Sequence, residues 1–310
     1  MRLTSRDLRI TERTQPMRQK LIEHLPVPGG DYQIARWAGT STCLLAIHGI
    51  TASHMAWPSV VDCLGGDYTI LAPDLRGRGA NNALPAPYGL KAHVTDLLAT
   101  LDHYRIDQCI VTGHSLGAYI ALELVTAAPD RINGLVLVDG GLALPLREGT
   151  TPEHVIAGVL GPALKRLDMR FADRAAYHVF WRQHPAFQDP GAWNPYVEAY
   201  VDYDLTGTPP EMVPKVNREA VRVDAYGPLD PTMVTLIDRV QKPMRLLTAP
   251  RGLLNQAQPL LPLHAIADKC ARLPQLHHVE IADTNHYSIV TGSGRTEVAR
   301  HLDEFVAAFG

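Results

Sequence analysis

Residues 109–128 constrain the fold of this chain more than any other part of its sequence. Residues 109–112 form a short, mostly apolar run, which is typical of a strand buried on both faces. The pentapeptide Gly113-His114-Ser115-Leu116-Gly117 follows at once, and an almost wholly apolar helical pattern continues to about Ala128. A strand that passes directly into a buried helix needs a tight turn, and the two glycines leave room for one. This stretch therefore predicts a strand–turn–helix unit with the Ser115 hydroxyl exposed at the turn.

The same alternation of short strands and helices runs through most of the chain. Helical spacing at residues 90–104 and 296–309 separates or follows apolar runs, and a turn signal, Pro28-Gly29-Gly30, indicates an early hairpin. We expect eight strands, at residues 21–27, 32–37, 43–47, 68–72, 109–112, 134–138, 244–248 and 278–281. This alternation predicts an α/β fold with a mostly parallel eight-stranded sheet flanked by helices.

One segment, residues 146–231, interrupts the alternation. It contains no convincing strand, its helical patterns are broken by prolines, and Thr151-Pro152-Glu153 is a good helix start. An insertion of this length is usually a substrate cap, and the alternative is an extra structural subdomain. We predict a helical lid inserted after the sixth strand at 146–231, a core made of residues 21–145 and 232–310, and an N-terminal arm at 1–20. The insertion is rich in aromatic side chains: Tyr177, Phe180, Trp181, Trp193, Tyr196, Tyr200 and Tyr203.

Composition excludes several classes of partner. The chain has 310 residues, a formal net charge of −3 and a pI near 6.5, which argues against nucleic acid and acidic membrane surfaces. No stretch is apolar enough to span a membrane, and the arginine-rich arm lacks the apolar core of a secretory signal, so we expect a cytoplasmic protein. Four cysteines without a CxxC pair favour free thiols over a disulfide framework or a metal site. We expect a monomer or homodimer.

With three further segments, the pentapeptide around Ser115 makes residues 21–310 resemble the α/β-hydrolase family. Residues 44–51, Leu-Leu-Ala-Ile-His-Gly-Ile-Thr, resemble the loop that supplies half of that family's oxyanion hole. The resemblance implies that the backbone N–H groups of Ile50 and Leu116 bind the developing oxyanion. We interpret His48 as a structural histidine that braces this loop.

The other two segments follow later strands. Residues 72–79 resemble the family's next loop, in which we expect Asp74 and Arg76 to hold loops by charge-assisted hydrogen bonds. Residues 281–289 resemble the loop that delivers the catalytic histidine, which would be His286 acting as general base and then general acid. The adjacent His277 and His278 have no second ligand set with suitable spacing, so we predict no metal.

The acid departs from the commonest family pattern. That pattern places an Asp or Glu after the strand that follows the lid, but residues 248–256 contain no carboxylate. Some members instead carry the acid after the preceding strand, where this chain has Asp139 followed by Gly140-Gly141. We assign Asp139 as the residue that orients His286; the alternative is that Asp139 merely caps the strand end, with Asp268 or Asp283 as the acid.

These residues favour a serine hydrolase that cleaves a carboxylic ester or lactone of a small to medium, mostly apolar substrate through an acyl-enzyme, without a cofactor. His54, Trp57 and Trp181 are our candidates for the substrate pocket, although each could simply pack in the core. Serine at the nucleophile position argues against dehalogenases and epoxide hydrolases of this fold, which use Asp there. Carbon–carbon bond hydrolysis, acyl transfer and cofactor-free perhydrolysis remain open on the same triad. An alternative of another class is a small-ligand receptor with an inherited triad.

Overall fold

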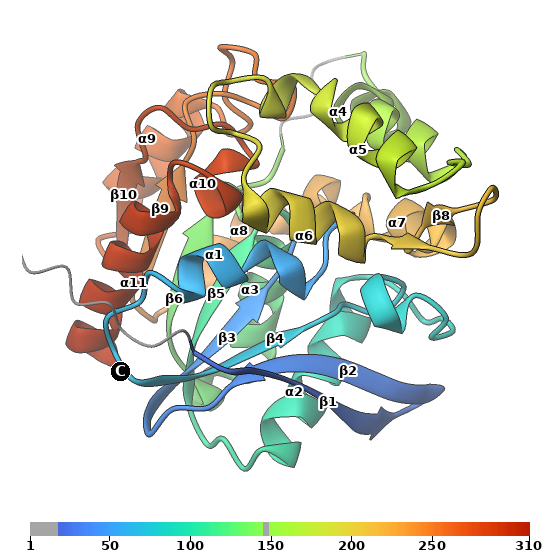
Figure 1. Ribbon diagram of the computed structural model, residues 1–310. Coiled ribbons are helices and arrows are strands. Elements are labelled where there is room, and N and C mark those ends of the chain that lie inside the picture. The colour runs from blue at the N-terminus through green and yellow to red at the C-terminus, as the bar shows by residue number, and fades with distance from the viewer. Residues whose placement is uncertain (1–17, 145–148) are drawn as a thin grey trace, which may run out of the picture.

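A mostly parallel eight-stranded sheet forms the centre of the molecule (Figure 1). The computed structural model describes residues 18–144 and 149–310, so residues 1–17 of the predicted arm lie outside it. The strand order is β1-β2-β4-β3-β5-β6-β9-β10, with antiparallel pairing for β1–β2 and β2–β4 and parallel pairing elsewhere. The strands are β1 (Lys20–Val27), β2 (Gly30–Trp37), β3 (Ser41–Ile47), β4 (Tyr68–Pro73), β5 (Cys109–His114), β6 (Ile132–Val138), β9 (Met244–Thr248) and β10 (Leu276–Glu280).

All eight predicted strands are therefore confirmed, including the hairpin of β1 and β2. The predicted starts of β2, β3, β6 and β10 were each two residues late. In the part of the chain that the structure describes, no helix combines the length and the apolar character needed to cross a membrane.

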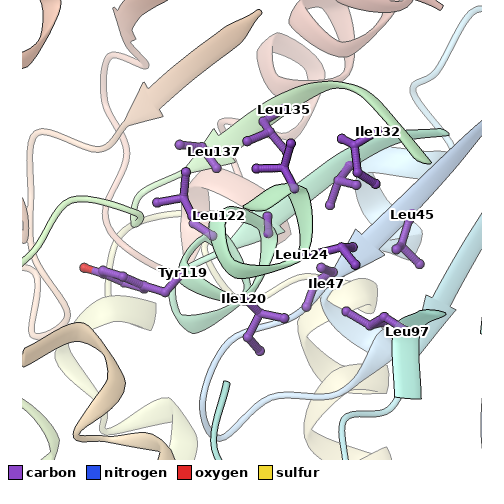
Figure 2. Packing of buried hydrophobic residues seen from close by; sticks show 14 of the residues in the cluster. Leu45, Ile47, Leu97, Tyr119, Ile120, Leu122, Leu124, Ile132, Leu135 and Leu137 are labelled. Atoms are coloured by element: carbon purple, nitrogen blue, oxygen red, sulfur yellow. The ribbon is translucent and has the colours of Figure 1, made fainter. Parts of the chain in front are cut away.

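Helices cover both faces of the central parallel strands, so most side chains of these strands are buried on both sides. Along β3, Cys43, Leu45 and Ile47 face one hydrophobic core, while Leu44 and Ala46 face the other. The first core is built around α3 (Leu116–Ala127), and Figure 2 shows its side chains packed against those of the neighbouring strands and of α2 (Leu90–His103). The second core lies under α1 (Pro58–Val61), α10 (Ser288–Thr291) and α11 (Arg295–Phe309).

The predicted lid segment lies beyond the C-terminal ends of the parallel strands (Figure 1). It contains α4 (Pro152–Leu167), α5 (Arg174–Arg182), α6 (Pro195–Tyr203) and α7 (Arg218–Asp224). Helix α4 begins as predicted, with the Thr151 side chain accepting from the His154 N–H. The expectation of no strand was wrong in one place, because β7 (Leu205–Thr206) and β8 (Val213–Pro214) pair in a short antiparallel ladder. Residue 146, the predicted start of the lid, lies outside the described residues.

The remaining elements belong to the core, except that the fourth and fifth 3₁₀ helices lie within the predicted lid segment. They are α8 (Met233–Leu236), α9 (Leu263–Arg272) and the short 3₁₀ helices η1 (His54–Ala56), η2 (Gly79–Asn81), η3 (Pro129–Arg131), η4 (Pro185–Phe187), η5 (Gly227–Leu229) and η6 (Ile237–Arg239). Strands β3, β5, β6 and β9 are parallel neighbours and end at the same edge of the sheet. The loops that follow them therefore meet at one place, below the lid segment.

Candidate active site

Ser115 occupies the turn between β5 and α3 with a left-handed backbone, φ +56°. Only close packing of glycines allows this turn. A Cβ atom on Gly113 would lie 2.2 Å from the Gly117 carbonyl oxygen, and one on Gly117 would lie 2.1 Å from the Ile47 carbonyl oxygen. The predicted need for glycine at both positions is thus confirmed. The Ser115 side chain stands at the N-terminus of α3, where helix N–H groups favour negative charge.

The loop after β3 passes directly beside Ser115. A Cβ on Gly49 would lie 3.2 Å from the Ser115 Cβ, so the absence of a side chain keeps this approach open. His48 Nδ1 donates to the Gly49 carbonyl oxygen at 2.8 Å, and its Nε2 accepts from the Leu75 N–H at 2.8 Å. Burial lowers the pKa of His48 to about 3, so the ring stays neutral and this pattern persists near neutral pH. His48 therefore braces the loop, as predicted.

The bond from His48 also orients the predicted oxyanion donor. The Gly49 carbonyl and the Ile50 N–H belong to one planar trans peptide, so fixing the carbonyl fixes the direction of the N–H. Among the described residues, neither the Ile50 N–H nor the Leu116 N–H donates a hydrogen bond to another group. Both residues line the same cavity as Ser115. Two free backbone donors beside a serine are the arrangement that an oxyanion hole requires.

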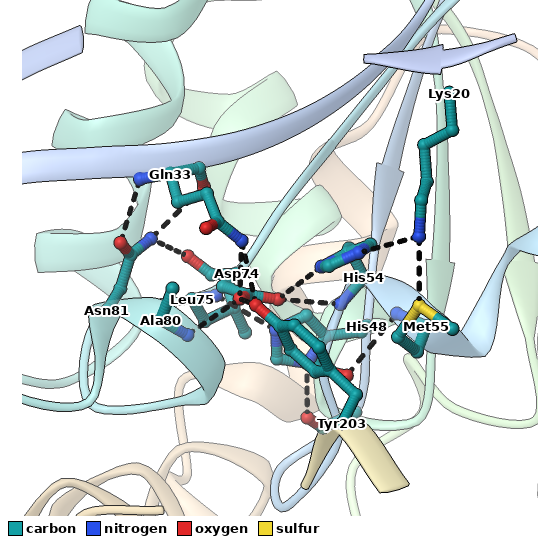
Figure 3. A network of polar contacts seen from close by, with 12 residues as sticks. Lys20, Gln33, His48, His54, Met55, Asp74, Leu75, Ala80, Asn81 and Tyr203 are labelled. Carbon is teal, nitrogen blue, oxygen red and sulfur yellow. Dashed lines mark hydrogen bonds and ion pairs between the residues drawn. The ribbon is translucent and has the colours of Figure 1, made fainter. Parts of the chain in front are cut away.

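Asp74 anchors the same region through a buried network (Figure 3). Its Oδ1 accepts from the His54 backbone N–H at 2.8 Å and from His54 Nδ1 at 2.9 Å; its Oδ2 accepts from the Tyr203 hydroxyl at 2.6 Å. Burial alone would raise the pKa of Asp74, but these hydrogen bonds and the neighbouring histidines outweigh it and lower the pKa. Arg76 forms a separate buried ion pair with Asp96 at 2.7 Å. The predicted loop-holding contacts of Asp74 and Arg76 are confirmed.

His286 lies in the loop after β10, and its ring contacts Asp139 at the end of β6. Nδ1 of His286 donates to Oδ2 of Asp139 at 2.6 Å, and Oδ1 of Asp139 accepts from the Ala249 N–H at 3.1 Å. Asp139 is fully buried and adopts φ +46°, and its own N–H donates to the Leu247 carbonyl at 2.7 Å. Because the second carboxylate oxygen is also held, the carboxylate cannot rotate away from the imidazole.

The histidine loop is tied to the serine turn as well. His114 Nε2 donates to the His286 carbonyl oxygen at 2.9 Å, and burial lowers the pKa of His114 well below its ordinary value. Within the described part of the chain, no hydrogen bond joins Ser115 Oγ to His286, although both side chains line one cavity. Catalytic hydrogen bonds are often long in substrate-free enzymes and shorten when substrate binds. The structure thus brings Ser115, His286 and Asp139 to one edge of the sheet.

The cavity between core and lid segment encloses about 90 Å³ and is largely apolar. Its polar lining includes Ser115, His286 and the tyrosines Tyr119, Tyr200 and Tyr287. None of the described lining residues is an Asp, Glu, Lys or Arg. Helix α4 forms one wall through Val155, Ile156, Val159, Leu160 and Ala163.

The three residues predicted to form the pocket do not line this cavity. The ring of His54 is turned toward Asp74, and Trp57 is buried in the second core. Trp181 packs behind the cavity wall, with ring centroids 5.6 Å from Phe187 and 6.2 Å from Tyr287. This correction has a simple cause, because nearness in sequence to the oxyanion loop or membership of the lid does not reveal which way a side chain points.

Sequence reasoning missed several lining residues for which a signal existed. Tyr287 follows His286 directly, so it was bound to lie near the reaction centre. The apolar residues of α4 recur at helical spacing, which marks one face of that helix.

Arg251 lies outside the cavity and binds Asp189 of the lid segment at 2.7 Å and the Thr284 carbonyl at 3.3 Å. Across the described ranges, no three His, Cys, Asp or Glu side chains are grouped so that they could hold a metal ion.

The chain is similar in sequence to a family model and to several known proteins. A family model described as alpha/beta hydrolase fold matches residues 42–213. Lipase LipV of Mycobacterium tuberculosis is 35% identical over 117 residues, which cover 38% of this chain and 43% of that protein. Epoxide hydrolase 2 of Siraitia grosvenorii is 37% identical over 101 residues, 32% of each chain. The matches therefore span less than half of these curated relatives.

Solved structures extend the similarity to nearly the full length. The crystal structure of E-2-(acetamidomethylene)succinate hydrolase superposes with a TM-score of 0.76 at 17% identity, covering 93% of this chain and 100% of that one. A thermophilic esterase from Thermogutta terrifontis gives a TM-score of 0.66 at 19% identity, covering 94% and 98%. At such identities the likeness shows the fold alone.

Proposed function

Because this chain belongs to the α/β-hydrolase fold family, we propose that it is a serine hydrolase that cleaves a carboxylic ester or lactone through an acyl-enzyme. One observation carries the proposal. Ser115 lies on a left-handed turn in an apolar cavity that it shares with His286, whose Nδ1 is bound by the buried Asp139 carboxylate. This is the set of groups that nucleophilic acyl transfer needs.

Acylation begins with the proton of Ser115. Its Oγ attacks the substrate carbonyl carbon while the hydroxyl proton passes to Nε2 of His286. The carbonyl oxygen becomes an oxyanion, which accepts hydrogen bonds from the backbone N–H groups of Ile50 and Leu116. Asp139 stabilises the imidazolium and keeps the Nδ1–H tautomer. The C–O bond to the leaving group then breaks as His286 protonates the alkoxide, and the alcohol departs.

Deacylation repeats these steps with water. His286 removes a proton from the water, whose oxygen attacks the acyl carbon, and the same two N–H groups hold the oxyanion. Collapse of the tetrahedral intermediate breaks the acyl–Ser115 bond, and His286 returns its proton to Oγ. The carboxylic acid leaves and the enzyme regains its starting state. No cofactor takes part in either half of this sequence.

The cavity lining supports a mostly apolar substrate of small to medium size. A cavity of about 90 Å³ with α4 as one wall suits a short or medium acyl chain, and no fixed charge in the described lining would bind a charged group. The epoxide hydrolase relative suggests a different reaction, but that chemistry on this fold uses an Asp nucleophile. This chain has serine at position 115, which favours acyl transfer to water.

Hydrolysis of p-nitrophenyl acetate and butyrate, with a small lactone panel, tests the proposal. We expect turnover by the wild type, covalent labelling by a fluorophosphonate probe, and loss of both in Ser115→Ala. Ser293→Ala is the matched control, because Ser293 is exposed and lies outside the cavity lining. If the wild type neither hydrolyses these substrates nor becomes labelled, while a small molecule raises its Tm, the protein is a small-ligand receptor and not a serine hydrolase.

A further inference from the structure

Arg78, in the loop after β4, is a fully buried charged residue that the proposed mechanism does not use. Its Nε donates to the Ile50 carbonyl oxygen at 2.8 Å, and its Nη1 donates to the Arg76 carbonyl oxygen at 2.9 Å. Nη1 also forms an ion pair with Asp224, whose side chain is likewise fully buried. Arg78 thus connects the loop that carries the predicted oxyanion donor to a second charged residue.

Asp224 is the last residue of α7, in the predicted lid. It is held by more than Arg78, since it accepts from the Gly89 N–H at 2.7 Å and from His93 Nε2 at 2.9 Å. Burial alone would raise the pKa of Asp224, but the Arg78 charge and the His93 hydrogen bond outweigh it and lower the pKa to about 2. The carboxylate is therefore ionised near neutral pH. Ala225, the next residue, lines the cavity.

The backbone reinforces this connection. Arg78 pairs with Val216 in an isolated antiparallel bridge, and the Asn217 N–H donates to the Gly77 carbonyl oxygen at 2.8 Å. The segment before α7 is therefore joined to the Arg78 loop by the main chain as well as by the ion pair. A displacement of α7 would move Asp224, and Arg78 would lose the partner that positions it.

The direction of the Ile50 N–H is set by the Gly49–Ile50 peptide plane, but its distance from Ser115 also depends on where the loop lies around Ile50. His48 fixes the preceding plane by binding the Gly49 carbonyl, and Arg78 fixes the following plane by binding the Ile50 carbonyl. If only the preceding plane is held, rotation about the Ile50 backbone bonds leaves the following part of the loop unanchored, and the loop can shift with its N–H relative to Ser115. An oxyanion donor that is misplaced by about 1 Å loses much of its effect on the transition state.

We propose that Arg78 is a positioning residue for the oxyanion hole, and that its ion pair with Asp224 makes the hole dependent on the correct seating of the lid. This inference rests on the proposed serine hydrolase function. According to this inference, Arg78 and Asp224, which lie 146 positions apart, affect the rate of acyl transfer and not substrate binding.

Two variants separate positioning from stability. Arg78→Lys keeps the charge but offers one ammonium group where the guanidinium reaches both the Ile50 carbonyl and Asp224. Asp224→Asn keeps the shape and removes the charge. The matched controls are Arg76→Lys and Asp96→Asn, which break a comparably buried ion pair that the same loop forms away from Ile50.

We expect Arg78→Lys and Asp224→Asn to lower kcat for p-nitrophenyl butyrate by about 10- to 100-fold with KM changed less than about threefold. Butylboronic acid, which forms a tetrahedral adduct with the serine, should lose affinity by a similar factor, while butyrate should bind as before. The controls should lower Tm by a comparable amount and leave kcat near the wild-type value.

Three results would overturn the inference. The first is wild-type kcat and boronic acid affinity in a folded Arg78→Lys or Asp224→Asn variant. The second is an equal loss of kcat in the Arg76→Lys and Asp96→Asn controls. The third is failure of both test variants to fold while the controls fold, which would show a purely structural ion pair. Absence of wild-type hydrolysis and labelling is a different result, because it rejects the serine hydrolase function itself.

Discussion

Replacing Asp139 with Asn tests the candidate triad most sharply, because the buried surroundings of this carboxylate dictate how an amide would sit. Oδ1 accepts from the Ala249 N–H at 3.1 Å, and Oδ2 accepts from His286 Nδ1 at 2.6 Å. In Asp139→Asn the amide oxygen must stay on the Ala249 side, since the reverse orientation sets two donors against each other. Leaving such buried donors unpaired costs about 1–3 kcal/mol.

The favoured orientation disables the histidine. The Asn NH₂ group then donates to Nδ1, which forces the proton of His286 onto Nε2. A protonated Nε2 cannot accept the Ser115 proton. The variant also loses the negative charge beside the imidazolium, worth about 4 kcal/mol at 4 Å in a medium of effective dielectric constant 20. The cost of reaching the active orientation, about 1–3 kcal/mol, and the lost charge, about 4 kcal/mol, together come to about 5–7 kcal/mol. At 1.36 kcal/mol per factor of ten, this predicts a fall in kcat of about 10⁴-fold or more.

The assay is kcat for p-nitrophenyl butyrate, with Tm and circular dichroism to show that the variant is folded. Asp283→Asn and Asp268→Asn are the controls, because both carboxylates are exposed and Asp268 pairs with Arg272 on the surface of α9. We expect both controls to keep kcat within about twofold of wild type. A folded Asp139→Asn variant with kcat within tenfold of wild type would refute the assignment, as would a large loss in Asp283→Asn.

Three further predictions concern the turn, the lid and the cavity. Gly113→Ala should cost several kcal/mol of stability because its Cβ would meet a carbonyl oxygen of α3 at 2.2 Å, whereas Gly158→Ala, with open space around the new Cβ, should stabilise α4 by about 0.5–1 kcal/mol; urea unfolding compares the two. Burial lowers the pKa of His184 to about 4. Between about pH 6.5 and pH 4, this histidine is therefore protonated in the unfolded chain but neutral in the folded protein. The free energy of unfolding consequently falls as pH falls from about 6.5 to about 4. His184→Asn should reduce this loss by up to about 1.4 kcal/mol per pH unit, and an unchanged slope of unfolding free energy against pH contradicts it. Val159→Phe, in the α4 wall, should lower kcat/KM for p-nitrophenyl octanoate relative to acetate by about tenfold, while Trp181→Phe, outside the lining, should leave that ratio unchanged.

Local patterns in the sequence were sufficient for the core. Strands buried on both faces appear as continuous apolar runs, so β3 and β5 could be recognised without any knowledge of their neighbours. The tight turn at Ser115 was predictable from its glycine motif, and the packing shows why only glycine fits at 113 and 117. The apolar runs and the glycine motif each consist of a few adjacent residues, so they can be recognised in the sequence without knowledge of the fold.

The features that could not be predicted depend on which way side chains point across the fold. His54 lies four residues after Ile50, yet its ring turns to Asp74 and away from the cavity. The ion pair of Arg78 with Asp224 joins the loop after β4 to the end of α7, and only the tertiary structure brings these two segments together. A buried arginine in a glycine-rich loop carries no periodic signal, so its partner cannot be inferred from spacing.

The position of Asp139, the proposed acid, shows how one chemical requirement can be met from either of two loops. Strand β6 lies between β5 and β9, so the loops after β6 and β9 are neighbours at the edge where His286 sits. In this chain the loop after β9 already makes hydrogen bonds to both the Asp139 carboxylate and the histidine loop. Its Ala249 N–H holds the Asp139 carboxylate, and its Arg251 binds the Thr284 carbonyl of the histidine loop and Asp189 of the lid segment. An acid at the end of β6 therefore reaches Nδ1 of His286 while the next loop supports both partners, which explains physically why the absence of a carboxylate at residues 248–256 is compatible with a complete triad.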